Sequence, residues 1–185
     1  MQKLRIPGRF EFPPLSRLRP PALVLAFTSL AAFGLCAWGG LRLNSTASLP
    51  LGLYRVSTAV DANLVEFCPL EPYSRLSVVR QYRNPGNCPD GDSPLLKPIV
   101  ARPGDVVVLS KWGIQVNGVL LRNTAPRSQD SKARLLPHYP FGTYRVSSET
   151  IWVASSYHPL SFDSRYFGPI STAIVRHRLK PFLTL

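Results

Sequence analysis

Residues 95–109 read LLKPIVARPGDVVVL, and their pattern predicts two strands joined by a tight turn. Proline and glycine at 103 and 104 interrupt extended structure, whereas the β-branched residues on both sides favour it. Side chains alternate between the two faces of a strand, so one face of the first strand carries Leu95, Lys97, Ile99 and Ala101. A lysine on this otherwise apolar face calls for an explanation.

The segments on both sides carry similar signals. Residues 113–121 contain a hairpin-like Val-Asn-Gly-Val. Two short strands, each beginning with a glycine, are predicted at 52–56 and 142–146. Residues 75–94 are rich in turn signals, and residues 123–138 read as a polar, basic, exposed loop. Nineteen prolines among 185 residues disfavour a helical bundle. We therefore predict a mainly β fold.

Composition excludes several classes of function. The 22 Lys and Arg residues outnumber the 10 Asp and Glu residues, but the arginines are scattered and no nucleic-acid recognition motif accompanies them. We expect no nucleic-acid partner, and attraction to anionic lipid headgroups or simple solubility explains the charge. The sequence has no P-loop, no dinucleotide-binding glycine pattern, no HExxH helix and no zinc-site cysteine spacing. We expect no cofactor and no metal.

Residues 21–41 read PALVLAFTSLAAFGLCAWGGL, without a charged side chain. A helix of this length extends about 31 Å, which matches a hydrocarbon core of about 30 Å. A cleavable signal peptide is the alternative, because residues 1–20 are basic; however, the run exceeds the usual apolar core of about 7–15 residues. We predict a cytoplasmic segment at 1–20, an uncleaved transmembrane signal anchor at 21–41 and a periplasmic domain at 42–185, at the inner membrane.

The three cysteines fit this orientation. Cys36 lies inside the apolar run and is expected to pack as a small apolar residue. Cys68 and Cys88 both lie in the exported part, twenty positions apart. An oxidising compartment favours a disulfide between them, and two unrelated buried thiols are the alternative.

Histidine-based catalysis has no support in the sequence, because none of His138, His158 and His177 lies in a nucleophile motif.

Lys97 offers a different chemistry. If it is buried, desolvation lowers its pKa, and the neutral amine can accept a proton from a serine hydroxyl. If it lies at an edge, it is an ordinary surface lysine. Ser48 follows shortly after the apolar run, and its position alone indicates a turn or cap residue.

Three segments resemble successive motifs of the signal peptidase I superfamily. They are SLP at 48–50, KPIVARPGD at 97–105 and SFDSRYFGP at 161–169, in this order behind a single anchor. Within that superfamily, PLGLY at 50–54, the Cys-Pro pair at 88–89 and the third motif are most similar to TraF-type conjugative-transfer peptidases. The resemblance implies a signal-peptidase-like β-sheet catalytic domain.

The resemblance also implies the catalytic residues. Ser48 matches the nucleophile and Lys97 the general base of a Ser–Lys dyad. Asp163 matches the acidic residue of the last motif, which is treated as catalytic in TraF-type members.

Three further residues match supporting positions. Thr46 lies two residues before the nucleophile, where a hydroxyl helps to form the oxyanion hole with the backbone N–H of Ser48. Ser161 is expected to orient the lysine by a hydrogen bond. Arg165 is expected to pair with Asp163 and to keep the last motif rigid.

Two features depart from the housekeeping signal peptidases. The sequence SSYHP at 155–159 stands where they have Gly-Asp-Asn, as in TraF-like sequences. Pro98 follows the lysine where they often have a basic residue, and it predicts an unpaired strand edge at that point, where an extended substrate could dock by strand addition.

The resemblance implies a single-pass serine endopeptidase. Its expected substrate is a membrane-inserted precursor, above all a conjugative pilin subunit, and its expected partners are inner-membrane lipid and conjugation or type IV secretion components. Cyclisation of the pilin is implied by the TraF resemblance alone. A general signal peptidase acting on exported preproteins is the first alternative, and a noncatalytic bitopic subunit of a secretion apparatus is the second.

Overall fold

The computed structural model describes residues 24–31, 34 and 40–185, and the chain divides into two compact units, residues 1–40 and 41–185. In the first unit, residues 24–31 are helical, and the Thr28 and Ser29 hydroxyls donate to carbonyl oxygens one turn earlier. The described residues contain no helix with the length and apolarity that a membrane crossing requires. The predicted segment 1–20 and much of the predicted anchor at 21–41 lie outside the described residues.

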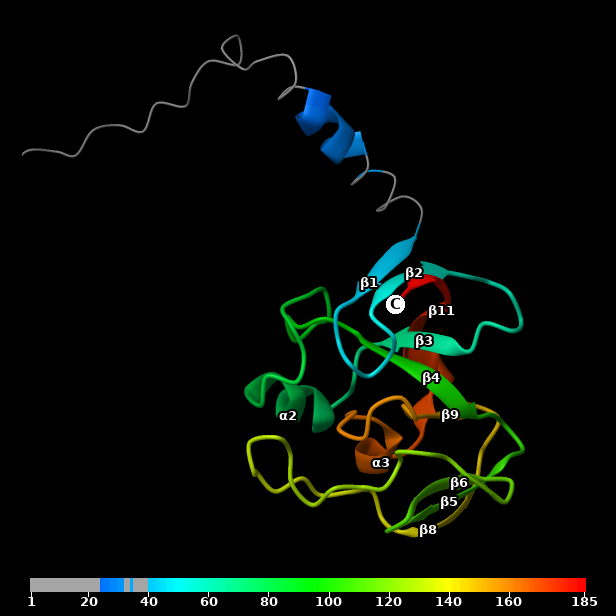
Figure 1. The fold of residues 1–185 in the computed structure, drawn as a ribbon. Helices are drawn as coiled ribbons and strands as arrows, with labels where there is room; N and C mark the ends of the chain where they lie inside the picture. Colours follow the sequence, from blue (N-terminus) through cyan, green and yellow to red (C-terminus); the bar gives the residue numbers. More distant parts are fainter. Residues whose placement is uncertain (1–23, 32–33, 35–39) are drawn as a thin grey trace, which may run out of the picture. The chain divides into compact units, whose positions relative to one another are not determined.

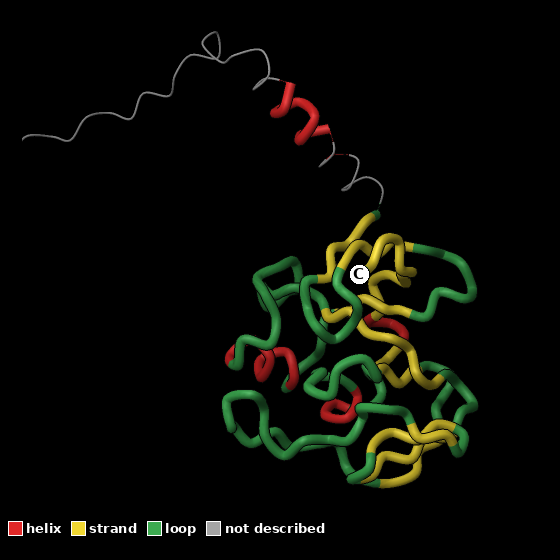
Figure 2. Tube along the Cα trace, in the orientation of Figure 1, coloured by secondary structure: helices red, strands yellow, loops and turns green. Residues whose placement is uncertain are grey.

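Residues 41–185 form two antiparallel sheets (Figures 1 and 2). The strands of the larger sheet are β1 (Leu41–Asn44), β2 (Gly52–Val56), β3 (Leu64–Phe67), β4 (Leu95–Ala101), β9 (Thr150–Val153), β10 (Ile170–Ser171) and β11 (Val175–Thr184). Their order is β1-β2-β11-β3-β4-β9-β10. The smaller sheet contains β5 (Val106–Ser110), β6 (Gly113–Val116), β7 (Val119–Leu120) and β8 (Gly142–Arg145), in the order β7-β6-β5-β8.

Helices are short in this second unit. They are α2 (Tyr73–Val79), α3 (Ser164–Phe167) and the 3-10 helix η2 (Thr172–Ile174). The prediction of a mainly β fold is therefore confirmed. Helix α2 falls partly within a segment that we expected to consist of turns, and its seven residues are too few to display a helical period in the sequence.

The two strands predicted within 95–109 are β4 and β5, and the predicted turn joins them. Asp105 closes this turn, because its Oδ2 accepts a hydrogen bond of 2.7 Å from the backbone N–H of Arg102. The hairpin predicted at Asn117-Gly118 joins β6 and β7. These local signals were sufficient because each turn depends on neighbouring residues only.

The four residues predicted to share one face of β4 lie on the side of the strand that packs into the interior. Leu95 belongs to an apolar cluster with Val65 and Phe67, and Ile99 packs against that cluster. Ala101 belongs to a second cluster, which includes Trp152 and residues of the small sheet. Lys97 lies between these positions and is only 4 % exposed. The domain therefore buries a lysine in its largest sheet.

The expectation of an unpaired edge at Pro98 is wrong at that residue. Pro98 pairs with Leu64 of β3, and its carbonyl oxygen accepts a hydrogen bond from the backbone N–H of Ala154, just beyond β9. Strand β9 begins its pairing at Ile99, so residues 95–97 have a strand partner on the β3 side alone among the described strands. The free edge lies just before the proline. Since Pro98 lacks an N–H, it ends the β9 ladder at this point.

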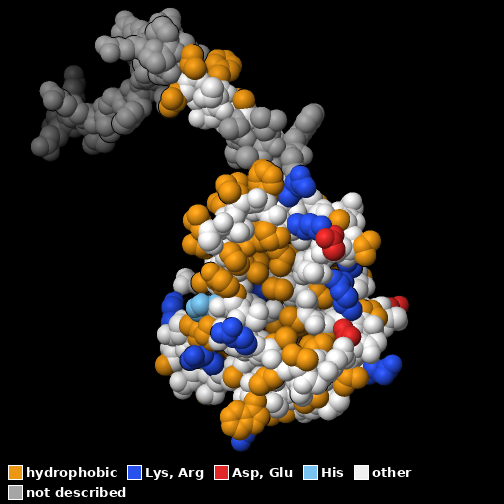
Figure 3. Space-filling view, turned by 45° about the vertical axis from the view of Figure 1, so that its right-hand side comes forward, with side chains coloured by type: hydrophobic (Ala, Val, Ile, Leu, Met, Phe, Trp, Pro, Cys, Tyr) orange, Lys and Arg blue, Asp and Glu red, His pale blue; other side chains and the backbone are white. Residues whose placement is uncertain are grey.

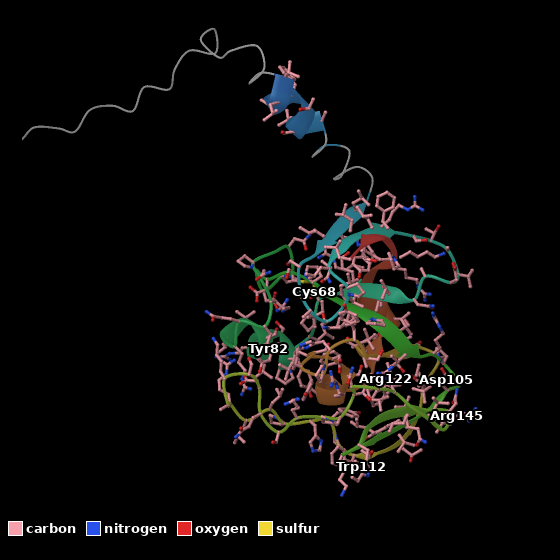
Figure 4. The ribbon with its side chains drawn as sticks, viewed as in Figure 1. Cys68, Tyr82, Asp105, Trp112, Arg122 and Arg145 are labelled. Carbon is pink, nitrogen blue, oxygen red and sulfur yellow. A yellow bond between two sulfur atoms is a disulfide. The ribbon has the colours of Figure 1, made fainter. Side chains whose placement is uncertain are left out.

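A disulfide joins Cys68 and Cys88, with their Cα atoms 5.7 Å apart (Cys68 is labelled in Figure 4). This confirms the predicted pair and excludes two free thiols. The disulfide ties the chain after β3 to the segment that follows α2. An ion pair between the buried Arg83 and the partly buried Asp90, and a 2.6 Å hydrogen bond from Ser74 Oγ to Asp90, hold the same segment.

Removal of this disulfide is expected to destabilise the domain by about 3 kcal/mol, because the closed loop spans 20 positions and its entropy returns to the unfolded chain. The measurement is chemical denaturation of the wild type and of the C68S/C88S variant, monitored by tryptophan fluorescence. A reducing agent should lower the midpoint of the wild type and leave that of the variant unchanged. Equal midpoints for the oxidised wild type and the variant would contradict the prediction.

Candidate active site

A cleft of about 750 Å³ is formed on residues 41–185. Its lining comes mainly from five segments that are distant in the sequence, within 42–48, 81–87, 93–97, 127–131 and 158–162. Tyr82, labelled in Figure 4, belongs to the segment after α2. The fold therefore brings the β1–β2 turn, the start of β4 and the last predicted motif to one cavity.

Ser48 lies in the turn that joins β1 to β2. Its side chain is partly exposed and lines the cleft. The Ser48 and Thr46 hydroxyl oxygens are 3.1 Å apart, and the Thr46 hydroxyl donates a 2.8 Å hydrogen bond to Asn44 Oδ1. Because the single Thr46 proton points to Asn44, Ser48 is the donor in the bond between the two hydroxyls.

Lys97 extends from β4 into the same cleft. Its ammonium group donates a 2.9 Å hydrogen bond to Ser161 Oγ in the buried interior. Burial lowers the pKa of Lys97 to about 8, against the attraction of Asp163, which raises it, and with the repulsion of Arg165, which lowers it further. A substantial fraction of this amine is thus neutral in mildly alkaline solution.

Asp163 and Arg165 form a fully buried ion pair. Arg165 Nε donates to Asp163 Oδ1 at 2.8 Å, and one of its terminal nitrogens donates to Oδ2 at 2.9 Å. The remaining Arg165 donors bind carbonyl oxygens, including that of Ser161 at 2.7 Å. Asp163 also caps α3 through the backbone N–H of Arg165. The pair fixes the segment that presents Ser161 to Lys97.

The structure brings four of the predicted site residues to the cleft lining, namely Thr46, Ser48, Lys97 and Ser161. Asp163 and Arg165 do not line the cleft and lie behind it. The side-chain hydrogen bonds of Asp163 go to Arg165 and to the backbone N–H of Ser155. Asp163 therefore influences Lys97 through its charge and through the shape of its segment.

Two residues at this site were not predicted from the sequence. The buried Asn44 side chain hydrogen-bonds the backbone of the β1–β2 turn. The buried Ser155 hydroxyl donates a 2.5 Å hydrogen bond to the carbonyl oxygen of Ser48. Asn44 ends a strand immediately before the turn, and an asparagine at that position could have indicated a side chain that hydrogen-bonds the turn. Ser155 is 107 positions from its partner, so no local pattern could reveal the contact.

The basic loop at 123–138 forms one wall of the cleft. The expectation of an exposed loop holds for most of its residues, but Thr124 and Leu136 are buried. Asp130 connects the loop to the segment after α2 by accepting a 2.6 Å hydrogen bond from the Tyr82 hydroxyl, and it forms an ion pair with Arg134 within the loop. The bond to Tyr82 keeps these two lining segments together.

The mainly β domain thus places a buried lysine and a serine on one cleft. The family model described as "Signal peptidase, peptidase S26" matches residues 21–182. The chain belongs to this family, which confirms the resemblance drawn from its motifs.

Curated relatives narrow the comparison to TraF proteins. "Plasmid transfer protein TraF" of Escherichia coli is 35% identical over 162 residues, which cover 84% of this chain and 88% of the relative. "Probable conjugal transfer protein TraF" of Sinorhizobium fredii is 35% identical over 165 residues, which cover 85% and 86% of the two chains. Among solved structures, a signal peptidase I of Enterococcus faecalis matches with a TM-score of 0.36 and 18% identity, covering 68% of this chain and 99% of its own.

Proposed function

We propose that this protein is a membrane-bound serine endopeptidase that processes a pilin precursor for conjugative transfer. The observation that carries the proposal is the buried Lys97, with its lowered pKa, on the same cleft as Ser48. The names of the TraF relatives support the role in conjugation. Membership of the signal peptidase family supports peptide-bond cleavage.

In the proposed acylation step, the neutral Lys97 amine accepts the Ser48 hydroxyl proton. Ser48 Oγ bonds to the scissile carbonyl carbon, the C–N bond breaks, and Lys97 returns the proton to the leaving amine. The backbone N–H of Ser48 and the Thr46 hydroxyl would stabilise the oxyanion, provided that Thr46 rotates away from Asn44. Ser161 keeps the amine in place.

The free edge at residues 95–97 supports the binding of an extended substrate. Ile99 donates to Asn63 on the β3 side, and antiparallel pairing alternates along the strand, so the backbone groups of Leu96 face away from β3. Leu96 lines the cleft. A substrate strand could hydrogen-bond Leu96 with its scissile bond close to Ser48.

An exposed apolar face supports a position of the domain at the bilayer. Leu43 of β1 and Leu183 of β11 lie opposite Leu53 of β2 on its two sides, so they share a face of the sheet. Leu43 is 74 % exposed and Leu183 is 66 % exposed. Figure 3 shows hydrophobic side chains gathered on one face of this unit. With the apolar run at 21–41, this patch favours an inner-membrane location with a periplasmic domain.

Water or the terminal amine of the substrate could resolve the acyl-enzyme. Hydrolysis gives a linear trimmed pilin, whereas attack by the amine closes a ring and gives a product lighter by one water. We propose ring closure on the TraF likeness. Mass spectrometry of a candidate conjugative pilin, produced with the wild type or with Ser48→Ala, tests both points. An unprocessed precursor with the wild type, or equal processing by both enzymes, would overturn the proposal.

The proposed mechanism predicts that cleavage accelerates with pH around a midpoint near 8. At pH 7, about one tenth of the Lys97 amines are neutral, so the second-order rate constant should rise about tenfold per pH unit below the midpoint. The measurement is the pH profile of kcat/KM with a quenched-fluorescence peptide that spans the processing site. A profile that stays flat from pH 6 to pH 9 would contradict Lys97 as the base.

The same pKa shift affects stability. The pKa of Lys97 is lowered from 10.5 in the unfolded chain to about 8 in the fold, so the unfolded chain binds more protons between these values. The Lys97 contribution to the free energy of unfolding therefore increases as the pH rises from about 8 to about 10.5.

A further inference from the structure

We propose that Asn44 and Ser155 are positioning residues that clamp the nucleophile turn, residues 45–50, from two sides. The inference rests on the proposed function, because it concerns how Ser48 is held ready for attack. Both residues are buried and polar: Asn44 is 6 % exposed and Ser155 is fully buried. Both direct their polar atoms to the backbone or hydroxyl groups of this turn.

Asn44 holds the turn from its own strand. Its Nδ2 shares two hydrogens among the carbonyl oxygens of Thr46, Leu49 and Pro50, which lie at 2.9, 3.2 and 3.0 Å. Its Oδ1 accepts from the Thr46 backbone N–H at 3.3 Å, and it also accepts from the Thr46 hydroxyl at 2.8 Å until that hydroxyl rotates to the oxyanion. A carboxamide supplies both donor and acceptor at this size, whereas a carboxylate would lose the donors and leucine would lose both.

Ser155 holds the turn from a segment that is distant in the sequence. Its hydroxyl donates to the Ser48 carbonyl oxygen and accepts from the backbone N–H groups of Tyr157 and His158 at 3.1 and 3.2 Å. Its own N–H donates to Asp163 Oδ2 at 3.0 Å. The buried Asp163–Arg165 pair is thereby connected to the peptide of the nucleophile through one residue.

The turn has few other attachments. Ser45, Thr46 and Ala47 are exposed, and Leu49 is the buried apolar side chain of the turn. Tyr54 supplies one more tie, a 2.7 Å hydrogen bond from its hydroxyl to the Pro50 carbonyl oxygen. Since apolar packing does not fix residues 45–48, the position of the Ser48 hydroxyl depends on the hydrogen bonds of the clamp.

The test measures acylation of Ser48 with p-nitrophenyl butyrate and the full chain in detergent micelles. The ester C–O bond breaks as Ser48 Oγ bonds to the acyl carbon, and nitrophenolate leaves. The rate of nitrophenolate release by the Ser48→Ala variant is subtracted as background. Ser155→Ala and Asn44→Ala should each lower the saturated rate of acylation about tenfold to a hundredfold, with the half-saturating ester concentration unchanged within about twofold.

Ser77→Ala is the matched control. Ser77 is also fully buried, donates to a backbone carbonyl at 2.7 Å and accepts from Arg83 at 2.9 Å, but it does not line the cleft. It should lower the melting temperature about as much as Ser155→Ala and leave acylation at the wild-type rate. The double variant N44A/S155A should lose less than the product of the two single losses, because both act on one turn.

The outcomes separate the inference from the proposed function. Equal release by the wild type and Ser48→Ala would overturn both. Release that depends on Ser48, together with wild-type rates in Ser155→Ala and Asn44→Ala, would overturn the clamp alone. If Ser77→Ala slows acylation as much as Ser155→Ala, the effect reflects a general loss of stability and the clamp is overturned. The same follows if the loss of acylation rate in N44A/S155A equals the product of the two single losses.

Discussion

Replacing Lys97 with methionine is expected to lower the rate of peptide cleavage by at least about 10⁴-fold while the domain stays folded. Methionine keeps an unbranched side chain in the buried position but has no atom that can accept the Ser48 proton. Loss of a buried amine also removes a desolvated charge from the interior. The measurement is kcat/KM with the peptide substrate, with circular dichroism as the check on the fold.

Lys111→Met is the control for this variant, because Lys111 is exposed and lies beside Trp112, away from the cleft lining. It should cleave at the wild-type rate. Cleavage by Lys97→Met at a tenth of the wild-type rate or more would contradict the assignment of Lys97 as the base, whatever the effect of Ser48→Ala.

Replacing Arg165 with methionine is expected to give the largest loss of stability, about 3–5 kcal/mol. The substitution leaves the Asp163 carboxylate at 0 % exposure without its ionic partner, and it also orphans the carbonyl oxygens of Ser161 and Pro159. Activity should fall with stability, since Ser161 loses its support beside Lys97. Chemical denaturation of the full chain in micelles measures the free energy of unfolding.

The control is Lys180→Met, which removes an ion pair with the exposed Asp61. Solvent screens that pair, so this variant should unfold close to the wild-type midpoint. A similar midpoint for Arg165→Met would mean that the buried pair contributes little, and the proposed support of the last motif would then be wrong.

The fold was predictable where the signal is local. Alternation along 95–101 predicted that Lys97 shares a strand face with three apolar residues, because a strand has a period of two. It left open whether the lysine is buried or lies at an edge, and the structure shows that it is buried. The Pro-Gly turn and the Asn-Gly hairpin depend on neighbouring residues in the same way. Helix α2 was missed because seven residues inside a turn-rich segment do not establish a period.

The candidate site was predictable only in part. Motifs identified Ser48, Lys97 and the last segment, but not the way in which they are held. The bond from Ser155 to Ser48 joins residues 107 positions apart, and its formation depends on the packing of β9 beside β4. The edge expected at Pro98 was misplaced, because the register between two strands cannot be read from one of them.

The most direct test of the account is the titration of the Lys97 amine itself, followed by NMR in protein labelled with ¹⁵N-lysine. The Lys97→Arg variant assigns its resonance. We predict a midpoint near 8 for this amine, well below the ordinary lysine value of 10.5. A midpoint for Lys97 above 10 would mean a charged amine at working pH and would contradict the proposed base.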